Sequence, residues 1–174
     1  MRKYAFLMAV FLFSCGNPEQ PKQETAGTYF DLKGYFNKEA QALNRRGPMV
    51  KKSVVVNDKA EEKQLKVTDW QKELSIFIDA DINKPAWKGE FKVSNNTNGS
   101  TYRSNNDQVP VKQVDIIRQG ETVKWITILI HNSNYLYSST DTLSYYPDSL
   151  YQIRKSQQIK LLSPKRYRIT GTFQ

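Results

Sequence analysis

A series of short β-prone runs separated by turn residues fills the last two thirds of this chain, and it limits the fold more than any other feature. Within residues 122–132, Trp125 and Leu129 alternate with Ile126 and Ile128, so both faces of this run are apolar. Such a run predicts a central strand that is covered on both sides. The other runs with strand character are residues 50–56, 64–67, 87–94, 100–104, 109–118, 136–146, 150–159 and 167–173. Their succession predicts antiparallel pairing, with the charged residues 57–62 as the first turn.

Two segments carry helical periodicity. The first ends near Gly47, which is a natural helix stop, and its apolar stripe consists of Tyr29, Leu32, Phe36, Ala40 and Leu43. The second begins at Thr68, which forms a capping box with Gln71, and it closes at Pro85. Runs of strands with segregated helices predict an α+β fold, with two α-helices packed on one face of an antiparallel β-sheet. A curved, half-barrel-like sheet is one form of this architecture.

The first residues have the order of a secretory signal. Arg2 and Lys3 precede an apolar run, residues 4–13, that is shorter than the ~20 residues of a membrane-spanning helix. The run ends in Leu12-Phe13-Ser14-Cys15, which resembles the lipobox of bacterial lipoprotein precursors. The resemblance implies a signal peptide over residues 1–14, acylation of Cys15 and anchoring of the chain to a membrane by its acyl chains. The alternative is an ordinary secreted protein with a cysteine near its cleavage site.

Cys15 is the only cysteine, so its lipidation would leave no thiol for a disulfide, a metal site or nucleophilic catalysis. The fold must therefore depend on its hydrophobic core alone. Residues 15–27 are rich in Pro, Gln, Glu and Lys, which predicts a flexible lipidated tether. Residues 28–174 then form a single α+β domain of ordinary size.

The formal net charge of the chain is +9, and it stays strongly positive without the signal segment. A basic surface favours anionic envelope components such as lipid headgroups, peptidoglycan carboxylates or acidic polysaccharide. The alternative is a surface that is basic only for solubility. Nucleic acid is excluded as a partner for a chain exported from the cytoplasm.

Several further segments resemble uncharacterised Gram-negative envelope lipoproteins. These segments are Glu73-Leu74, Phe77, residues 80–85, 134–138, 143–145, 151–153 and 167–171. The resemblance implies export and lipidation, and it brings no known reaction, cofactor or catalytic residue. Gly16-Asn17 follows Cys15 in place of the Asp that retains some lipoproteins in the inner membrane, which favours the outer membrane. The predicted shape is also similar to the half-barrels that carry lipids or lipoproteins across the periplasm.

The sequence nominates no catalytic or metal-binding residues. His131 is the only histidine, so one chain cannot hold a histidine-based triad or a multi-histidine metal site, and we expect a turn or edge histidine. Asp79 and Asp81 lack the Gly and the distant Glu of an EF-hand, and residues two apart on a helix diverge. We interpret this pair as a helix terminus that turns the chain.

Tyrosines are dense in the last third of the chain, interspersed with basic residues. Aromatic and basic side chains together suit sugar stacking or a membrane headgroup interface. The predicted binding surface consists of Tyr135, Tyr137, Tyr145, Tyr146, Tyr151, Lys155 and Tyr167. The alternative is that these tyrosines simply cover a sheet face. In addition, Thr142 and Ser149 each follow Asp and precede Leu, a pattern that resembles a bacterial O-glycosylation acceptor.

These features favour a non-enzymatic envelope lipoprotein whose domain binds a protein, glycan or lipid partner. A hydrophobic cavity would favour lipid carriage, and a filled core would favour protein or glycan binding. The main alternative is an envelope enzyme, such as a glycan hydrolase with two carboxylates ~5–9.5 Å apart. A structural linker between the outer membrane and peptidoglycan fits the tether and the charge equally well.

Overall fold

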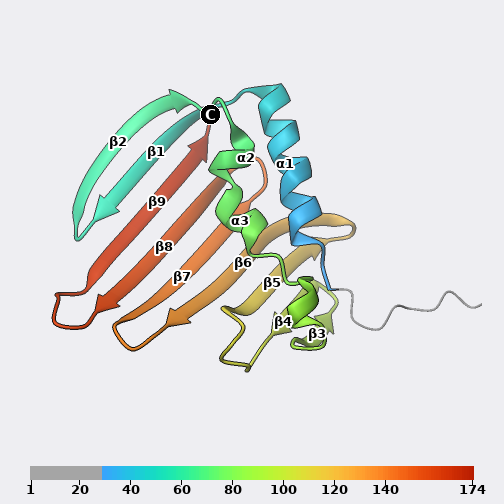
Figure 1. Cartoon of the computed structure of the whole chain (residues 1–174). Helices are drawn as coiled ribbons and strands as arrows, with labels where there is room; N and C mark the ends of the chain where they lie inside the picture. Colours follow the sequence, from blue (N-terminus) through green and yellow to red (C-terminus); the bar gives the residue numbers. More distant parts are fainter. Residues whose placement is uncertain (1–28) are drawn as a thin grey trace, which may run out of the picture.

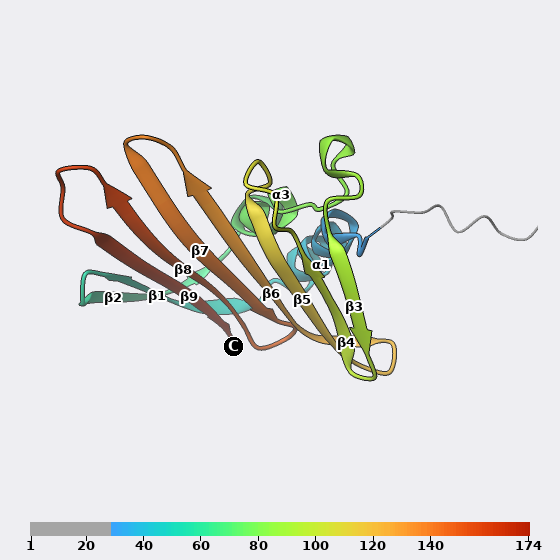
Figure 2. The same ribbon diagram turned by 90° about the horizontal axis from the view of Figure 1, so that it is seen from below.

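In the computed structural model, which describes residues 29–174, nine antiparallel strands form one sheet with three helices and a 3₁₀ turn. Figure 1 shows the strands side by side in the order β2-β1-β9-β8-β7-β6-β5-β4-β3. The sheet stays open, with β2 and β3 as its edges, and Figure 2 shows its strands fanning out as a twisted sheet requires. The elements are α1 (Leu32–Arg46), β1 (Met49–Val56), β2 (Lys59–Lys66), α2 (Trp70–Glu73), α3 (Ser75–Asp79), η1 (Pro85–Trp87), β3 (Lys92–Asn96), β4 (Gly99–Arg103), β5 (Val111–Gln119), β6 (Thr122–Ser133), β7 (Tyr137–Tyr146), β8 (Leu150–Ile159) and β9 (Lys165–Phe173). The predicted α+β class and the antiparallel sheet are confirmed.

The first helix begins later than predicted and ends where predicted. The side chain of Asp31 caps α1 by accepting a hydrogen bond from the N–H of Gly34 at 2.8 Å. Gly47 ends the helix in the left-handed conformation and donates its N–H to the carbonyl of Leu43 at 2.8 Å. Tyr29 precedes the helix but is still buried in the core.

The second predicted helix is two short helices, α2 and α3, that meet at Leu74. Thr68 is not its cap. The side chain of Asp69 accepts a hydrogen bond from the N–H of Lys72 at 3.0 Å and takes that role. Leu74 lies between the two helices, and its side chain is fully buried in the core. Pro85 begins a separate 3₁₀ turn that ends at Trp87. The strand predicted from residue 87 therefore does not begin there.

Two predicted boundaries around the first hairpin are wrong. The turn between β1 and β2 consists of Asn57 and Asp58 alone, both with positive φ, and not of residues 57–62. The charged residues that follow continue the edge strand β2, where most side chains are exposed. Charge on an edge strand opposes pairing with another chain, so these residues suit the edge although their strand propensity is low.

The side chains of the middle strands divide into two faces, which we call the inner face and the outer face. The inner face of β6 carries Ile126 and Ile128, which are fully buried. The outer face of the same strand carries Trp125, which is 40% exposed. The prediction that this strand is covered on both sides is therefore wrong. The apolar residues on its outer face form a second surface, which no helix covers.

The helices and the inner face share one core. Figure 1 shows α1 and α3 crossing in front of the middle strands, and Phe36 of α1 packs on Phe77 of α3 and on Tyr145 of β7 at ring-centroid distances of 4.9 and 5.2 Å. At the other end, Trp70 packs on Tyr151 at 6.4 Å. The buried core residues of the described part lie between Tyr29 and Tyr151.

Two core tyrosines direct their hydroxyls to helix carboxylates. Tyr145 donates a hydrogen bond to Glu39 at 2.6 Å, and Tyr151 donates one to Glu73. Burial raises the pKa of both tyrosines far above their ordinary value of 10.0, and the accepting carboxylates raise it further. These phenols therefore keep their protons in the folded protein at pH values where an unfolded tyrosine ionises.

This difference predicts alkaline instability. Below about pH 10 the folded and the unfolded protein both keep the tyrosine protons, so the buried tyrosines contribute their full stabilisation. Above about pH 10 only the folded protein keeps them, so the free energy of unfolding falls as the pH rises. Each buried tyrosine adds about 1.4 kcal/mol per pH unit to that fall. Urea unfolding from about pH 8 to about pH 11 should give a shallower fall for Tyr145→Phe than for the wild type. The exposed Tyr135→Phe is the control, and equal slopes for Tyr145→Phe and wild type would refute the mechanism.

The N-terminal signal, Cys15 and the tether lie outside the described residues. None of the helices in residues 29–174 combines the length and the hydropathy needed to cross a bilayer.

Candidate anion-binding site

The outer face of β8 and β9 carries a group of arginines. Arg154 on β8 lies directly opposite Arg168 on β9, and Arg166 lies opposite Ser156 two positions further along. On the neighbouring strand β7, Thr142 is opposite Arg154 in register. Because side chains alternate along a strand, all of these groups project to the same face.

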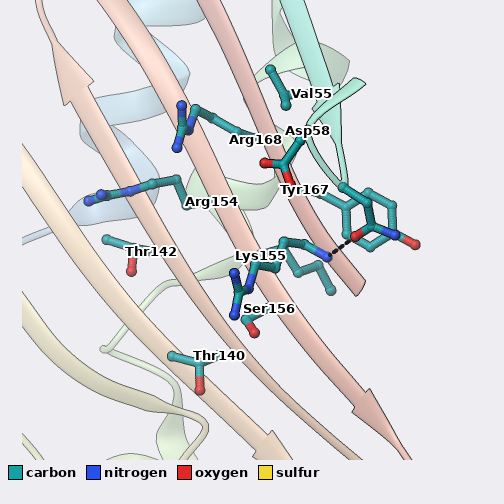
Figure 3. A pocket seen from close by; sticks show the side chains of 11 residues that line it. Val55, Asp58, Thr140, Thr142, Arg154, Lys155, Ser156, Tyr167 and Arg168 are labelled. Carbon is teal, nitrogen blue, oxygen red and sulfur yellow. Dashed lines mark hydrogen bonds between the residues drawn. The ribbon is translucent and has the colours of Figure 1, made fainter. Parts of the chain in front are cut away.

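These side chains line a depression of about 430 Å³, the arginine depression, that is open to solvent. Figure 3 shows Arg154 and Arg168 extending to the same side from adjacent strands, with the hydroxyls of Thr142, Ser156 and Thr140 along its base. The β1–β2 turn forms the opposite wall. The residues that line the depression are Val55, Asn57, Asp58, Thr140, Thr142, Arg154, Lys155, Ser156, Arg166, Tyr167 and Arg168.

The turn wall is fixed to β9 by two hydrogen bonds. Asn57 donates its N–H to the carbonyl of Arg166 at 3.1 Å, and its side-chain oxygen accepts the N–H of Arg166 at 2.9 Å. The dashed line in Figure 3 marks the second of these bonds. Asn57 and Asp58 both adopt positive φ, which Asn and Asp tolerate better than most residues. The backbone of Arg166 and both the backbone and the side chain of Asn57 therefore fix this wall of the depression.

The charges of the arginine depression are not balanced. Arg154, Arg166 and Arg168 take part in no ion pair within residues 29–174, whereas Lys52, Lys155 and several other basic residues do. Like charges directly opposite each other on neighbouring strands destabilise a sheet. An anion placed between the guanidinium groups would remove this repulsion.

The chemistry of the lining fits an oxyanion. A guanidinium group presents paired N–H donors that match the oxygens of a phosphate or a carboxylate, and threonine and serine hydroxyls add single donors. Asp58 is the only carboxylate among the lining residues described. The two carboxylates of a hydrolase are therefore not found in this depression. Within the described part of the chain, no group of three or more His, Cys, Asp or Glu side chains is arranged to hold a metal ion.

His131 extends the polar face toward β6. Its Nδ1 lies 3.2 Å from the hydroxyl of Thr140, which lines the arginine depression. The expectation of a turn or edge position is wrong, because β6 continues to Ser133 and lies between β5 and β7. The histidine is half-buried on the outer face.

The tyrosines predicted to form one binding surface are separated by the fold. Tyr145 and Tyr151 are fully buried in the core, so they cannot contact a partner in this conformation. Their rings were misplaced because an alternating strand pattern does not reveal which face the helices cover. Tyr146 lies on the outer face beside Trp125, with the ring centroids 6.3 Å apart, and Tyr135 is 83% exposed in the β6–β7 loop.

The remaining predicted surface residues direct their side chains to the inner face, beyond the helices, although Lys155 and Tyr167 also line the arginine depression. Tyr137 and Tyr167 are half-buried there, in line with Lys155, which is opposite Tyr167 in register. Lys155 donates a hydrogen bond to the buried Asp141 at 3.1 Å. Lys155 therefore neutralises a core carboxylate, and little of its charge is free for a partner.

The other candidate residues have separate places. Asp81 accepts the N–H of Asn83 at 2.9 Å, which confirms the interpretation of this pair as a helix terminus. Asn83 in turn accepts the N–H of Tyr29 at 2.8 Å and so fixes the segment before α1. Thr142 is half-buried in β7, whereas Ser149 is exposed in the β7–β8 turn. Glycosylation at either residue stays a prediction.

A second depression, the inner groove, lies between α2–α3 and the inner face of β1, β8 and β9. It has a volume of about 600 Å³ and is open to solvent. Ile76, Ile153 and Ile169 supply apolar surface, and Lys52 and Lys155 flank them. The space directly beneath the helices is filled by large, fully buried side chains, among them Trp70 and Phe77.

Comparison of the chain with protein-family models, with curated proteins and with solved structures finds no match.

Sequence reasoning missed the arginine depression. It identifies basic residues in the last third of the chain but does not pair Arg154 with Arg168. The signal was present, because a hairpin that pairs residues 150–157 with 165–172 places Arg154 opposite Arg168. Finding it required the register of the hairpin, which the weakly turn-like residues 160–164 do not specify.

Proposed function

We propose that this chain is a lipoprotein of the bacterial envelope, anchored through Cys15, whose domain binds an anionic group of a glycan or lipid in the arginine depression without catalysing a reaction. The outer membrane is the proposed location, on the resemblance of the N-terminal segment to a lipobox without a following Asp. The partner chemistry is a phosphate or carboxylate group that is carried by a glycan or a lipid headgroup.

One observation carries this proposal: Arg154 and Arg168 face each other on adjacent strands and have no carboxylate partner in residues 29–174. Such a pair costs free energy in the isolated sheet. Arginine–anion hydrogen bonds are among the stronger polar contacts in proteins, so a bound anion would more than offset that cost. The net charge of +9 would also attract anionic partners at long range.

The filled core supports recognition of a surface group over carriage of a whole lipid, because large side chains occupy the space beneath the helices. The envelope hydrolase remains the alternative function. It would require two carboxylates in a cleft, and the arginine depression supplies only Asp58 among its described lining residues.

Calorimetric titration of residues 16–174 tests the proposal with two soluble ligands that represent the two sources of anion. One is a uronate oligosaccharide, and the other is glycerophosphoglycerol, the headgroup of an anionic lipid. We expect saturable binding of at least one, weakened by added salt. Arg154→Gln should lower the affinity about tenfold, because it removes a charge-assisted hydrogen-bonding group.

Arg103→Gln is the matched control. Arg103 lies on β4, far from β8 in the strand order, and its guanidinium group is held by Gln113 at 3.0 Å. Its replacement should leave the affinity unchanged. The proposal fails if neither ligand binds, or if Arg154→Gln binds as tightly as the wild type.

A further inference from the structure

Two neighbouring loops at one end of the sheet expose large apolar side chains. Leu161 and Leu162 of the β8–β9 loop are 96% and 57% exposed, and Tyr135 and Leu136 of the β6–β7 loop are 83% and 59% exposed. We call these four residues the apolar tip. Single exposed apolar residues are common on proteins, but several together at the end of two loops mark an interaction site.

The two loops are held together, so the apolar tip is one surface. Lys160 donates its N–H to the carbonyl of Leu136 at 2.9 Å. Its ammonium group lies 3.1 Å from the hydroxyl of Tyr135 and 4.1 Å from the centre of that ring. The side-chain amide of Gln158, near the end of β8, donates a hydrogen bond to the carbonyl of Leu162 in the β8–β9 loop at 3.0 Å. These hydrogen bonds order the loop backbones while the leucine side chains stay in solvent.

The charged residues of the two loops are all basic. Lys160, Lys165 and Arg166 accompany it, and residues 134–138 and 158–166 contain no Asp or Glu. Arg166 also lines the arginine depression, so the two surfaces adjoin. Leucines at a protruding tip, a tyrosine beside them and a basic surround are the arrangement that suits the interface of an anionic bilayer.

We propose that the apolar tip inserts into the headgroup region of an anionic bilayer, with Leu161 and Leu162 in the acyl boundary and Lys160, Lys165 and Arg166 at the phosphates. A protein partner is less favoured, because the surface is small and the charged residues of its two loops are all basic. This contact would add to the proposed lipid anchor on Cys15, and it adjoins the arginine depression, with which it shares Arg166. It would hold the end of the sheet that carries these two loops at the membrane surface.

The test uses residues 16–174, which contain no cysteine, so Leu161→Cys introduces a unique site for an environment-sensitive fluorophore. The vesicles are phosphatidylcholine alone or phosphatidylcholine with about 30 mol % phosphatidylglycerol. We expect a blue shift and an intensity increase with the anionic vesicles and a much smaller change with the neutral ones.

Co-sedimentation of unlabelled protein gives the binding strength. Leu161→Asp should reduce partitioning onto anionic vesicles by about tenfold or more, because it removes an inserted apolar side chain and adds a repelled charge. Val93→Asp is the control, since Val93 is a 47% exposed apolar residue on the edge strand β3. Both variants should melt at the wild-type temperature. Absence of binding to anionic vesicles, or equal losses in the two variants, would overturn the proposal.

Discussion

We expect Gly171→Ala to destabilise the domain by about 3 kcal/mol or more, although it adds a single methyl group. Gly171 on β9 is opposite Tyr151 on β8, and the tyrosine ring lies across it. A Cβ atom at this position would be 2.2 Å from two ring carbons and 2.4 Å from the hydroxyl. Because Tyr151 is fully buried and hydrogen-bonded to Glu73, its ring has no free space to enter. Urea unfolding at neutral pH measures this loss.

A double-mutant cycle separates this clash from a general loss of strand stability. In a Tyr151→Leu background the ring is absent, so the same Gly171→Ala change should have a much smaller effect. Thr172→Ala, at the exposed next position, should change stability by less than about 0.5 kcal/mol. Equal losses from Gly171→Ala in both backgrounds would show that the glycine is required for another reason.

Arg168→Glu should affect binding and stability in opposite directions. The substitution places a carboxylate opposite Arg154, so it replaces a like-charge pair by an ion pair and should stabilise the sheet by about 0.5 kcal/mol at low salt. The same change removes one anion donor and adds a repelling charge, so anion affinity should fall by more than tenfold. Thermal unfolding and calorimetry on the same preparations measure the two effects.

The opposite signs make the comparison informative. If Arg168 served the fold alone, its replacement would destabilise the domain. Binding would then weaken only to the extent that the variant unfolds. Arg103→Glu, on the outer face of β4, is the control for a change of net charge and should leave the anion affinity nearly unchanged. If Arg168→Glu destabilises the domain without weakening anion binding, the arginine pair has a structural role and the site is elsewhere.

The sequence predicts most of the sheet because its strands alternate and its turns are marked. It does not predict the break at Leu74, because leucine is a good helix former and no Gly or Pro lies in residues 68–79. It also assigns the helix cap to Thr68, since Thr and Asp at neighbouring positions offer the same chemistry and only the backbone distinguishes them.

The functional surfaces were harder to predict than the fold. Tyr145 and Tyr146 are adjacent and chemically identical, yet one is in the core and the other is on the outer face. Which face is covered depends on where α1 and α3 pack, and no local pattern contains that information. Arg154 and Arg168 likewise become a site only through the register of β8 and β9.

The most direct test of the anion site is nuclear magnetic resonance of the arginine Nε–H groups during titration of residues 16–174 with pyrophosphate. We predict that the signals of Arg154, Arg166 and Arg168 shift together and saturate with one dissociation constant, while the signal of Arg103 stays in place. If the signal of Arg103 shifts as much as the others, or if no signal saturates, the arginine depression does not bind anions specifically.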